Sequence, residues 1–169
     1  MTEKTVFYLS SDPDTGISLP IKGELTSSSY IDAGKGITKA NLVKVEIGTA
    51  VTSISQFTFY QCIALKSVTI PDSVKSIYDA VFNGCSALTQ VTIPDSVTSI
   101  DQAVFNDCSA LTQVTIPDSV TSIDFNAFTR CTSLKSLTIP DSVTTIRLAA
   151  FSESAIETLY MSENNGLNL

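Results

Sequence analysis

The chain has 169 residues, of which 17 are acidic and 10 basic, and it contains no histidine. This acidic balance excludes the basic surface that nucleic acids and anionic membranes require. Without histidine, Ser-His-Asp and Cys-His catalysis are excluded and the commonest metal ligand is missing. No run of about 18 apolar residues is present. Residues 1–10 carry no signal-peptide pattern. We therefore expect no membrane insertion and see no secretory signal.

Residues 1–41 lack the periodicity of the rest of the chain, and we expect them to form a β cap. The sequence predicts a strand at Thr5–Leu9, a turn at residues 11–16 and a returning strand at residues 17–25. Such a β-hairpin would cover the open edge of the first repeat. A small independent docking element is the alternative.

From residue 42 onward, a 23-residue repeat dominates the sequence. Positions that recur at this period form columns, and five of these columns are isoleucine, phenylalanine, leucine, valine and cysteine. The phenylalanine column is Phe59, Phe82, Phe105, Phe128 and Phe151, and the cysteine column is Cys62, Cys85, Cys108 and Cys131. A constant period with several apolar columns predicts a solenoid of stacked coils about 4.8 Å apart. One half-repeat and five repeats would occupy residues 42–161, followed by a short tail at residues 162–169.

Each repeat predicts two strands and two turns. The alternating Gln-Val-Thr-Ile at residues 90–93 indicates a strand with valine and isoleucine inward. Pro-Asp-Ser then forms a turn in which Asp can bond the local backbone. Ser-Val-Thr-Ser-Ile predicts a shorter second strand, and the segment around Phe-x-x-Cys predicts a 3-10 turn. The expected architecture is mostly β, with a principal parallel sheet.

This pattern resembles the BspA-like leucine-rich repeats. The residues that carry the resemblance in one repeat are Leu88, Val91, Ile93, Pro94, Val97, Ile100, Phe105 and Cys108. The resemblance implies a right-handed leucine-rich-repeat solenoid with a curved, non-enzymatic binding surface. It also implies attachment to host matrix or cells, and a cell-surface or extracellular location, because family members are often surface proteins of host-associated microbes.

The cysteine and aspartate columns raise the question of metal binding. Zinc sites need close cysteine pairs, which a spacing of 23 does not provide, and parallel side chains converge poorly for disulfides. We therefore expect free, buried thiols. A second column, Asp72, Asp95, Asp118 and Asp141, offers too few oxygens for calcium, so we expect turn formation and solubility. No metal or cofactor is expected.

A catalytic carboxylate pair is also disfavoured. Asp101 and Asp124 recur beside Ser99 and Ser122, but repeated positions should have identical environments, whereas glycoside chemistry needs two different ones. We therefore expect no enzyme.

The outward positions of the principal strands are the candidate binding residues. One column begins at Lys44 and the other at Glu46. Their further members are Ser67, Gln90, Gln113 and Ser136, and Thr69, Thr92, Thr115, Thr138 and Tyr160. They form either a partner-binding face or an ordinary solvated strand surface. The sequence favours a recognition module for a protein or glycan. The alternative is a structural component that self-associates or belongs to a larger complex.

Overall fold

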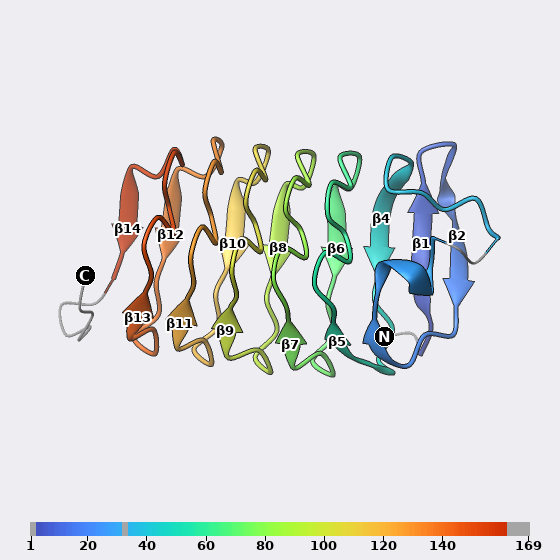
Figure 1. Ribbon diagram of the computed structural model, residues 1–169, viewed down its shortest axis with the longest axis horizontal. Helices are drawn as coiled ribbons and strands as arrows, with labels where there is room; N and C mark the ends of the chain where they lie inside the picture. Colours follow the sequence, from blue (N-terminus) through green and yellow to red (C-terminus); the bar gives the residue numbers. More distant parts are fainter. Residues whose placement is uncertain (1–2, 32–33, 162–169) are drawn as a thin grey trace.

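A computed structural model describes residues 3–31 and 34–161; the predicted tail at residues 162–169 lies outside them. The coils stack in sequence order, and their strands form two rows (Figure 1). The long-strand row consists of β4 (Leu42–Glu46), β6 (Ser67–Thr69), β8 (Gln90–Thr92), β10 (Gln113–Thr115), β12 (Ser136–Thr138) and β14 (Thr158–Tyr160). The short-strand row consists of β5 (Val51–Ile54), β7 (Ser76–Ile77), β9 (Ser99–Ile100), β11 (Ser122–Ile123) and β13 (Thr145–Ile146).

Except between β10 and β12, neighbouring strands of the long-strand row pair in parallel, and equivalent repeat positions face each other. Val91 of β8 lies opposite Val114 of β10, for example. The last pair has an offset of 22 because the final repeat is one residue short, so Ser136 lies opposite Thr158. The predicted mostly β solenoid with a principal parallel sheet and short second strands is confirmed.

A stack of aromatic rings forms the centre of the core. Phe59, Phe82, Phe105 and Phe128 are fully buried. With the half-buried Phe151, their successive ring centroids lie 5.3 to 5.7 Å apart, with the ring planes inclined by 7° to 16°. Offset stacking of this kind stabilises the fold beyond the contribution of burying each ring. The repeat thus places the same ring at the same depth in every coil.

The predicted 3-10 turns form as successive β-turns instead of a 3-10 helix. Their hydrogen bonds run from residue i to residue i−3, as from Cys85 N to Phe82 O at 3.0 Å. Two columns within this segment adopt a left-handed backbone, and they are Phe57, Ala80, Ala103, Asn126 and Ala149, and Gln61, Gly84, Asp107, Arg130 and Glu153. These conformations prevent a continuous helix, and each non-glycine residue costs about 1–2 kcal/mol.

Seven of the ten left-handed residues donate their backbone N–H to a carbonyl of the following coil. In the second column, the N–H groups of Gln61, Gly84, Asp107 and Arg130 donate to carbonyls one coil ahead at 2.8 to 2.9 Å. Buried backbone donors need such partners. The local strain is therefore offset by hydrogen bonds between coils.

The N-terminal cap differs in detail from the predicted hairpin. β1 (Thr5–Leu9) pairs antiparallel with both β4 and β2 (Asp12–Leu19), and β2 begins inside the predicted turn at residues 11–16. The predicted returning strand at residues 17–25 is wrong beyond Leu19, because β3 (Gly23–Leu25) leaves the hairpin and pairs in parallel with β5. Pro13 is accommodated because β2 is an edge strand of its sheet.

Tyr30 extends the ring stack into the cap. It follows the 3-10 turn η1 (Ser27–Ser29), is fully buried, and stacks on Phe59 at 5.6 Å and on Phe7 at 4.9 Å. Its hydroxyl donates to the carbonyl of Thr58 at 2.7 Å. Burial raises the pKa of Tyr30. The cap therefore supplies a ring that the repeat itself does not.

Candidate functional site

The predicted binding residues lie along the long-strand row, and we call their surface the polar face. Eight of the nine are exposed and Ser67 is half-buried; they are Ser67, Thr69, Gln90, Thr92, Gln113, Thr115, Ser136, Thr138 and Tyr160. The pairing places Gln113 opposite Gln90 and Thr138 opposite Tyr160. The sheet thus brings them together as two columns, as their alternation with inward valines requires.

The polar face differs from a neighbouring threonine column that serves the fold. The hydroxyls of Thr89 and Thr112 donate to carbonyls one coil back, at 3.4 and 3.1 Å. By contrast, none of the nine polar-face side chains makes a hydrogen bond to another residue in the described part of the chain. Their donors and acceptors are therefore available to a partner.

An ion pair lies at the N-terminal end of the polar face. Lys44 Nζ lies 2.7 Å from Glu46 Oε1 and 4.5 Å from the centroid of the Tyr8 ring. The hydrogen bond between them raises the pKa of Lys44 and lowers that of Glu46. The sequence prediction missed Tyr8, although its place in a strand beside the first repeat could have suggested a position on this face.

The polar face is interrupted where strand pairing fails. β10 ends the six-stranded sheet, while β12 pairs with β14 instead. A groove of about 540 Å³ lies between them, lined by residues 112–116 and 136–138 and by Tyr160. Between β6 and β8 only Ser67 and Gln90 pair, and a second groove there measures about 330 Å³.

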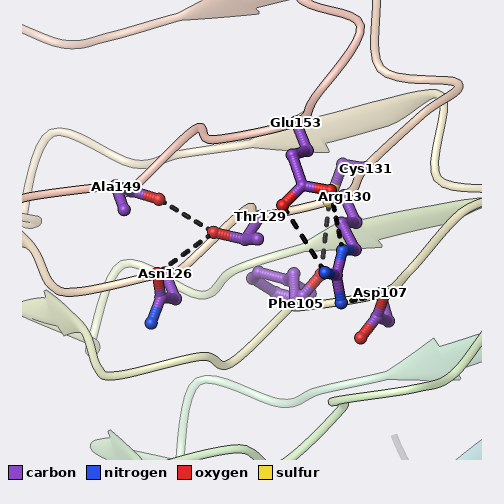
Figure 2. Close-up of polar contacts among 8 residues, drawn as sticks. All are labelled: Phe105, Asp107, Asn126, Thr129, Arg130, Cys131, Ala149 and Glu153. Carbon is purple, nitrogen blue, oxygen red and sulfur yellow. Dashed lines mark hydrogen bonds and ion pairs between the residues drawn. The ribbon is translucent and has the colours of Figure 1, made fainter.

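All four cysteines are free and buried, but they do more than fill volume. The thiols of Cys85, Cys108 and Cys131 donate to the carbonyl of the phenylalanine one coil back, at 3.1 to 3.2 Å. Figure 2 shows this contact between Cys131 and Phe105. Burial raises the pKa of Cys62 to about 11 and that of Cys131 to about 12. Such thiols are poor nucleophiles and poor metal ligands near neutral pH.

The same close-up shows how charged residues connect three coils. Arg130 lies between Glu153, whose Oε2 is 3.0 Å from Arg130 Nε, and Asp107, whose Oδ1 is 3.8 Å from Nη1 (Figure 2). The hydroxyl of Thr129 donates to the carbonyl of Ala149 at 2.8 Å. These ion pairs are exposed, so each contributes little to stability.

The aspartate columns do not assemble a site. In each Pro-Asp-Ser-Val turn, the valine N–H donates to the proline carbonyl, as from Val97 to Pro94 at 3.0 Å, and Asp95 is exposed without a side-chain hydrogen bond. The predicted bonding of this Asp column to the backbone is therefore wrong. Within residues 3–31 and 34–161, no three acidic or cysteine side chains converge as a metal site would need.

Asp101 and Asp124 have different environments, contrary to prediction. Asp101 accepts a hydrogen bond from Ser99 at 2.6 Å, and burial raises its pKa. Asp124 lies 3.3 Å from Arg147 Nε. The repeat predicts identical positions, but Arg147 occurs in only one of the neighbouring coils. Neither carboxylate lines a groove of the polar face.

The repeat matches a known protein family. A family model described as the BspA type leucine-rich repeat region matches residues 37–165 in six copies. No curated protein matches the sequence significantly. No helix in the described part of the chain has the length and hydropathy needed to cross a bilayer.

Several solved structures share the fold. A leucine-rich cell surface protein from Faecalibacterium prausnitzii A2-165 is 34% identical over 85% of this chain and 43% of that one, with a TM-score of 0.61. The leucine-rich repeat protein of T. pallidum is 27% identical over 72% of this chain and 59% of that one, at 0.67. A leucine-rich repeat protein from Bacteroides ovatus ATCC 8483 is 24% identical over 95% of this chain and 40% of that one, with a TM-score of 0.68. The chain thus spans between about two fifths and three fifths of their lengths.

Proposed function

Because the chain belongs to the BspA-type leucine-rich repeat family, we propose that it is a non-enzymatic recognition module. Its polar face binds a protein or glycan of another molecule, and its role is adhesion at a cell surface. The similarity to a leucine-rich cell surface protein supports that location. The absence of histidine and the lack of carboxylates in the groove between β10 and β12 support binding without chemistry.

One observation carries this proposal: eight of the nine polar-face residues are exposed, and none of the nine side chains hydrogen-bonds to another residue in the described part of the chain. The hydroxyl of Thr112 donates a hydrogen bond to the preceding coil. The side chains of Gln113 and Thr115, on the same segment, make no hydrogen bond to the described residues. The face spans six strands, or roughly 25–30 Å. A standard interface uses about 800 Å² per partner, so additional surface or multivalency must contribute to tight binding.

The test replaces four residues of the polar face with lysine. Gln90, Thr92, Gln113 and Thr115 are changed together, and Lys44 shows that this sheet accepts lysine in the first of the two columns. The intact chain and the variant are then used for affinity capture from lysate and surface fractions of the source, with identification by mass spectrometry. We expect the variant to lose a stoichiometric partner without a large change in thermal stability.

A matched control adds the same charge elsewhere. It carries lysine at Thr52, Thr98, Thr121 and Thr144, a column at the short-strand row in which Lys75 occurs naturally. Because the hydroxyls of Thr121 and Thr144 donate to the preceding coil, a thermal melt first establishes that this variant is folded. We expect this variant to keep the partner. Equal capture by both variants would contradict the proposal, because the effect of the four lysines would then not depend on the face that carries them.

A second candidate, self-association, is favoured by the C-terminal end. β14 is an edge strand with all three residues exposed, and Leu148 is 80% exposed. Unpaired strand edges are templates for pairing with another chain. Light scattering over a range of concentrations tests this candidate, and a monomer at high concentration would rule it out.

A further inference from the structure

The groove between β10 and β12 is the place where the polar face becomes concave. Its volume of about 540 Å³ lies in the range of small-ligand sites, about 300–1,000 Å³. Its floor includes the inward Val114, which is half-buried here, whereas its equivalents Val91 and Leu137 are buried. The break in strand pairing therefore opens both apolar and polar surface to a ligand.

Tyr160 distinguishes this groove from the rest of the face. It occupies a position that is threonine in the four preceding coils, and its side chain is 58% exposed. It also lines an adjoining groove of about 460 Å³, together with Asp118 and Asp141. The ring therefore lies between two concave surfaces that are rich in hydrogen-bonding groups.

One buried hydroxyl in the adjoining groove has no partner. Ser142 Oγ is buried without a hydrogen bond, although its equivalent Ser119 donates to Val97 O at 2.6 Å. An unsatisfied buried polar group is unfavourable for the folded state. Ser73 Oγ, at the same position of an earlier coil, is buried and unpaired as well, so this feature is shared by two coils and is not specific to the groove.

The chemistry of both grooves selects the ligand class. Their side chains supply amide, hydroxyl and carboxylate groups, and neither groove is lined by lysine or arginine. Anionic ligands would meet Asp118 and Asp141 without a compensating cation, which disfavours phosphate, sulfate and acidic sugars. A neutral sugar has hydroxyls that both donate and accept, and a C–H face that packs on an aromatic ring.

We propose that the groove between β10 and β12 binds a neutral glycan, with one sugar ring stacked on Tyr160. This inference rests on the proposed function, because it names the ligand of the same face. Gln113, Thr115 and Thr138 then hydrogen-bond the sugar hydroxyls. The groove between β6 and β8 has similar polar groups, including Ser67 and Gln90, but no ring, so it serves as an internal comparison.

The test is affinity electrophoresis of the full chain in native gels. The probes are mannan, galactan, arabinan, mixed-linkage β-glucan and soluble chitin oligosaccharides, with heparin and hyaluronan as anionic polymers. We expect at least one neutral polymer to retard the protein and the anionic ones not to. Retardation should persist at high salt, because no ion pair is involved.

Variants of Tyr160 identify the site, with affinities for the retarding polymer taken from the same gels. Tyr160→Thr restores the residue of the other coils and should weaken binding about tenfold or more, the scale of a central interface residue. Tyr160→Phe keeps the ring and should bind within about threefold of the natural chain. Thr98→Ala, an exposed position at the short-strand row outside the polar face, should leave binding unchanged.

Three results would overturn the proposal: no retardation by any neutral polymer, retardation by the anionic polymers alone, or unchanged binding by Tyr160→Thr. If any of these occurs while the four-lysine variant still loses a captured protein, the glycan inference fails and the recognition function stands. Unchanged capture by the four-lysine variant, or equal loss of capture by the control variant, would instead remove the recognition function itself.

Discussion

The two ends of the solenoid bury their terminal coils to different extents. At the N-terminal end, β1 pairs along β4, and Tyr30 and Phe7 continue the ring stack with no exposed surface. At the C-terminal end of the described residues, the last ring of the stack, Phe151, is half-buried, and no described strand pairs with the outer edge of β14. Since each coil buries its side chains against its neighbours, the last described coil, which has a described neighbour on one side only, buries less. Within the described residues, stability should therefore decline from the cap toward this coil.

The largest expected effect contrasts the middle of the ring stack with its open end. Phe105→Ala should lower the free energy of unfolding by about 3–5 kcal/mol, because a fully buried ring leaves a cavity. Phe151→Ala should cost about 1–2 kcal/mol, because this ring is already partly in water. Urea unfolding followed by circular dichroism measures both. Equal losses would contradict the difference between the ends.

A smaller effect is expected from removing one hydroxyl at each end. Tyr30→Phe keeps the stacked ring but leaves the buried carbonyl of Thr58 without its donor, which should cost about 1–2 kcal/mol. Tyr160→Phe is the matched control, since that side chain is exposed and makes no hydrogen bond to the described residues. Thermal melts of the two variants should separate clearly. A Tyr30→Phe melt that overlays the natural chain would show that the cap is loosely attached.

The cysteines near the two ends should make the stability of the protein depend on pH. Unfolded cysteine has a pKa of about 8.5, whereas burial raises that of Cys62 to about 11 and that of Cys131 to about 12. Folding holds these thiols protonated, so their contribution to stability is complete below about pH 8.5 and is lost as the pH rises toward the folded values. Melting temperatures measured from pH 7 to 11 should fall accordingly.

Alkylation of the native protein at pH 8, mapped by mass spectrometry, shows which thiols become accessible first. All four thiols should react slowly and become reactive in denaturant. Cys131, nearest the open end, should react before Cys108 because local opening is easier there. Faster reaction of Cys62, beside the cap, would reverse the expected order.

The smallest effect concerns the left-handed columns. Residues 81–101 and 104–124 differ only at Gly84 and Asp107, and both of these residues have positive φ. Asp107→Gly should stabilise the protein by about 0.5–1 kcal/mol, because glycine adopts this backbone without strain. Asp107→Ala removes the same carboxylate but retains Cβ, so it should give no gain. A gain from both variants would point to charge and not to backbone strain.

The regular part of the fold was predictable because the period identifies equivalent positions without knowledge of their contacts. The phenylalanine and cysteine columns, the two strands of each coil and the outward residues such as Gln90 follow from alternation and spacing. The β cap was predictable as a class of structure, but the path of residues 17–25 was not, because β3 is positioned by its pairing with β5.

The features that escaped prediction depend on tertiary contacts. Tyr30 lies 29 residues before Phe59, so column arithmetic with a period of 23 cannot place it in the ring stack. β8 and β10 have the same sequence, yet only β10 borders the 540 Å³ groove, because pairing fails on one side of it. The left-handed backbone of Ala103 is set by its hydrogen bond to the next coil and not by its side chain.

The bonds between coils also bear on how such a chain changes over generations. Ring contacts, thiol donors and left-handed N–H groups all join adjacent coils, each kind at a constant sequence offset. A deletion or duplication of 23 residues, such as residues 85–107, would rejoin equivalent positions and preserve every one of these contacts. A change of another length shifts the register of the positions that follow it, as in the one-residue-short final repeat, where Ser136 lies opposite Thr158. Recombination between repeats can therefore lengthen or shorten the molecule in steps of one coil while both of its ends stay the same.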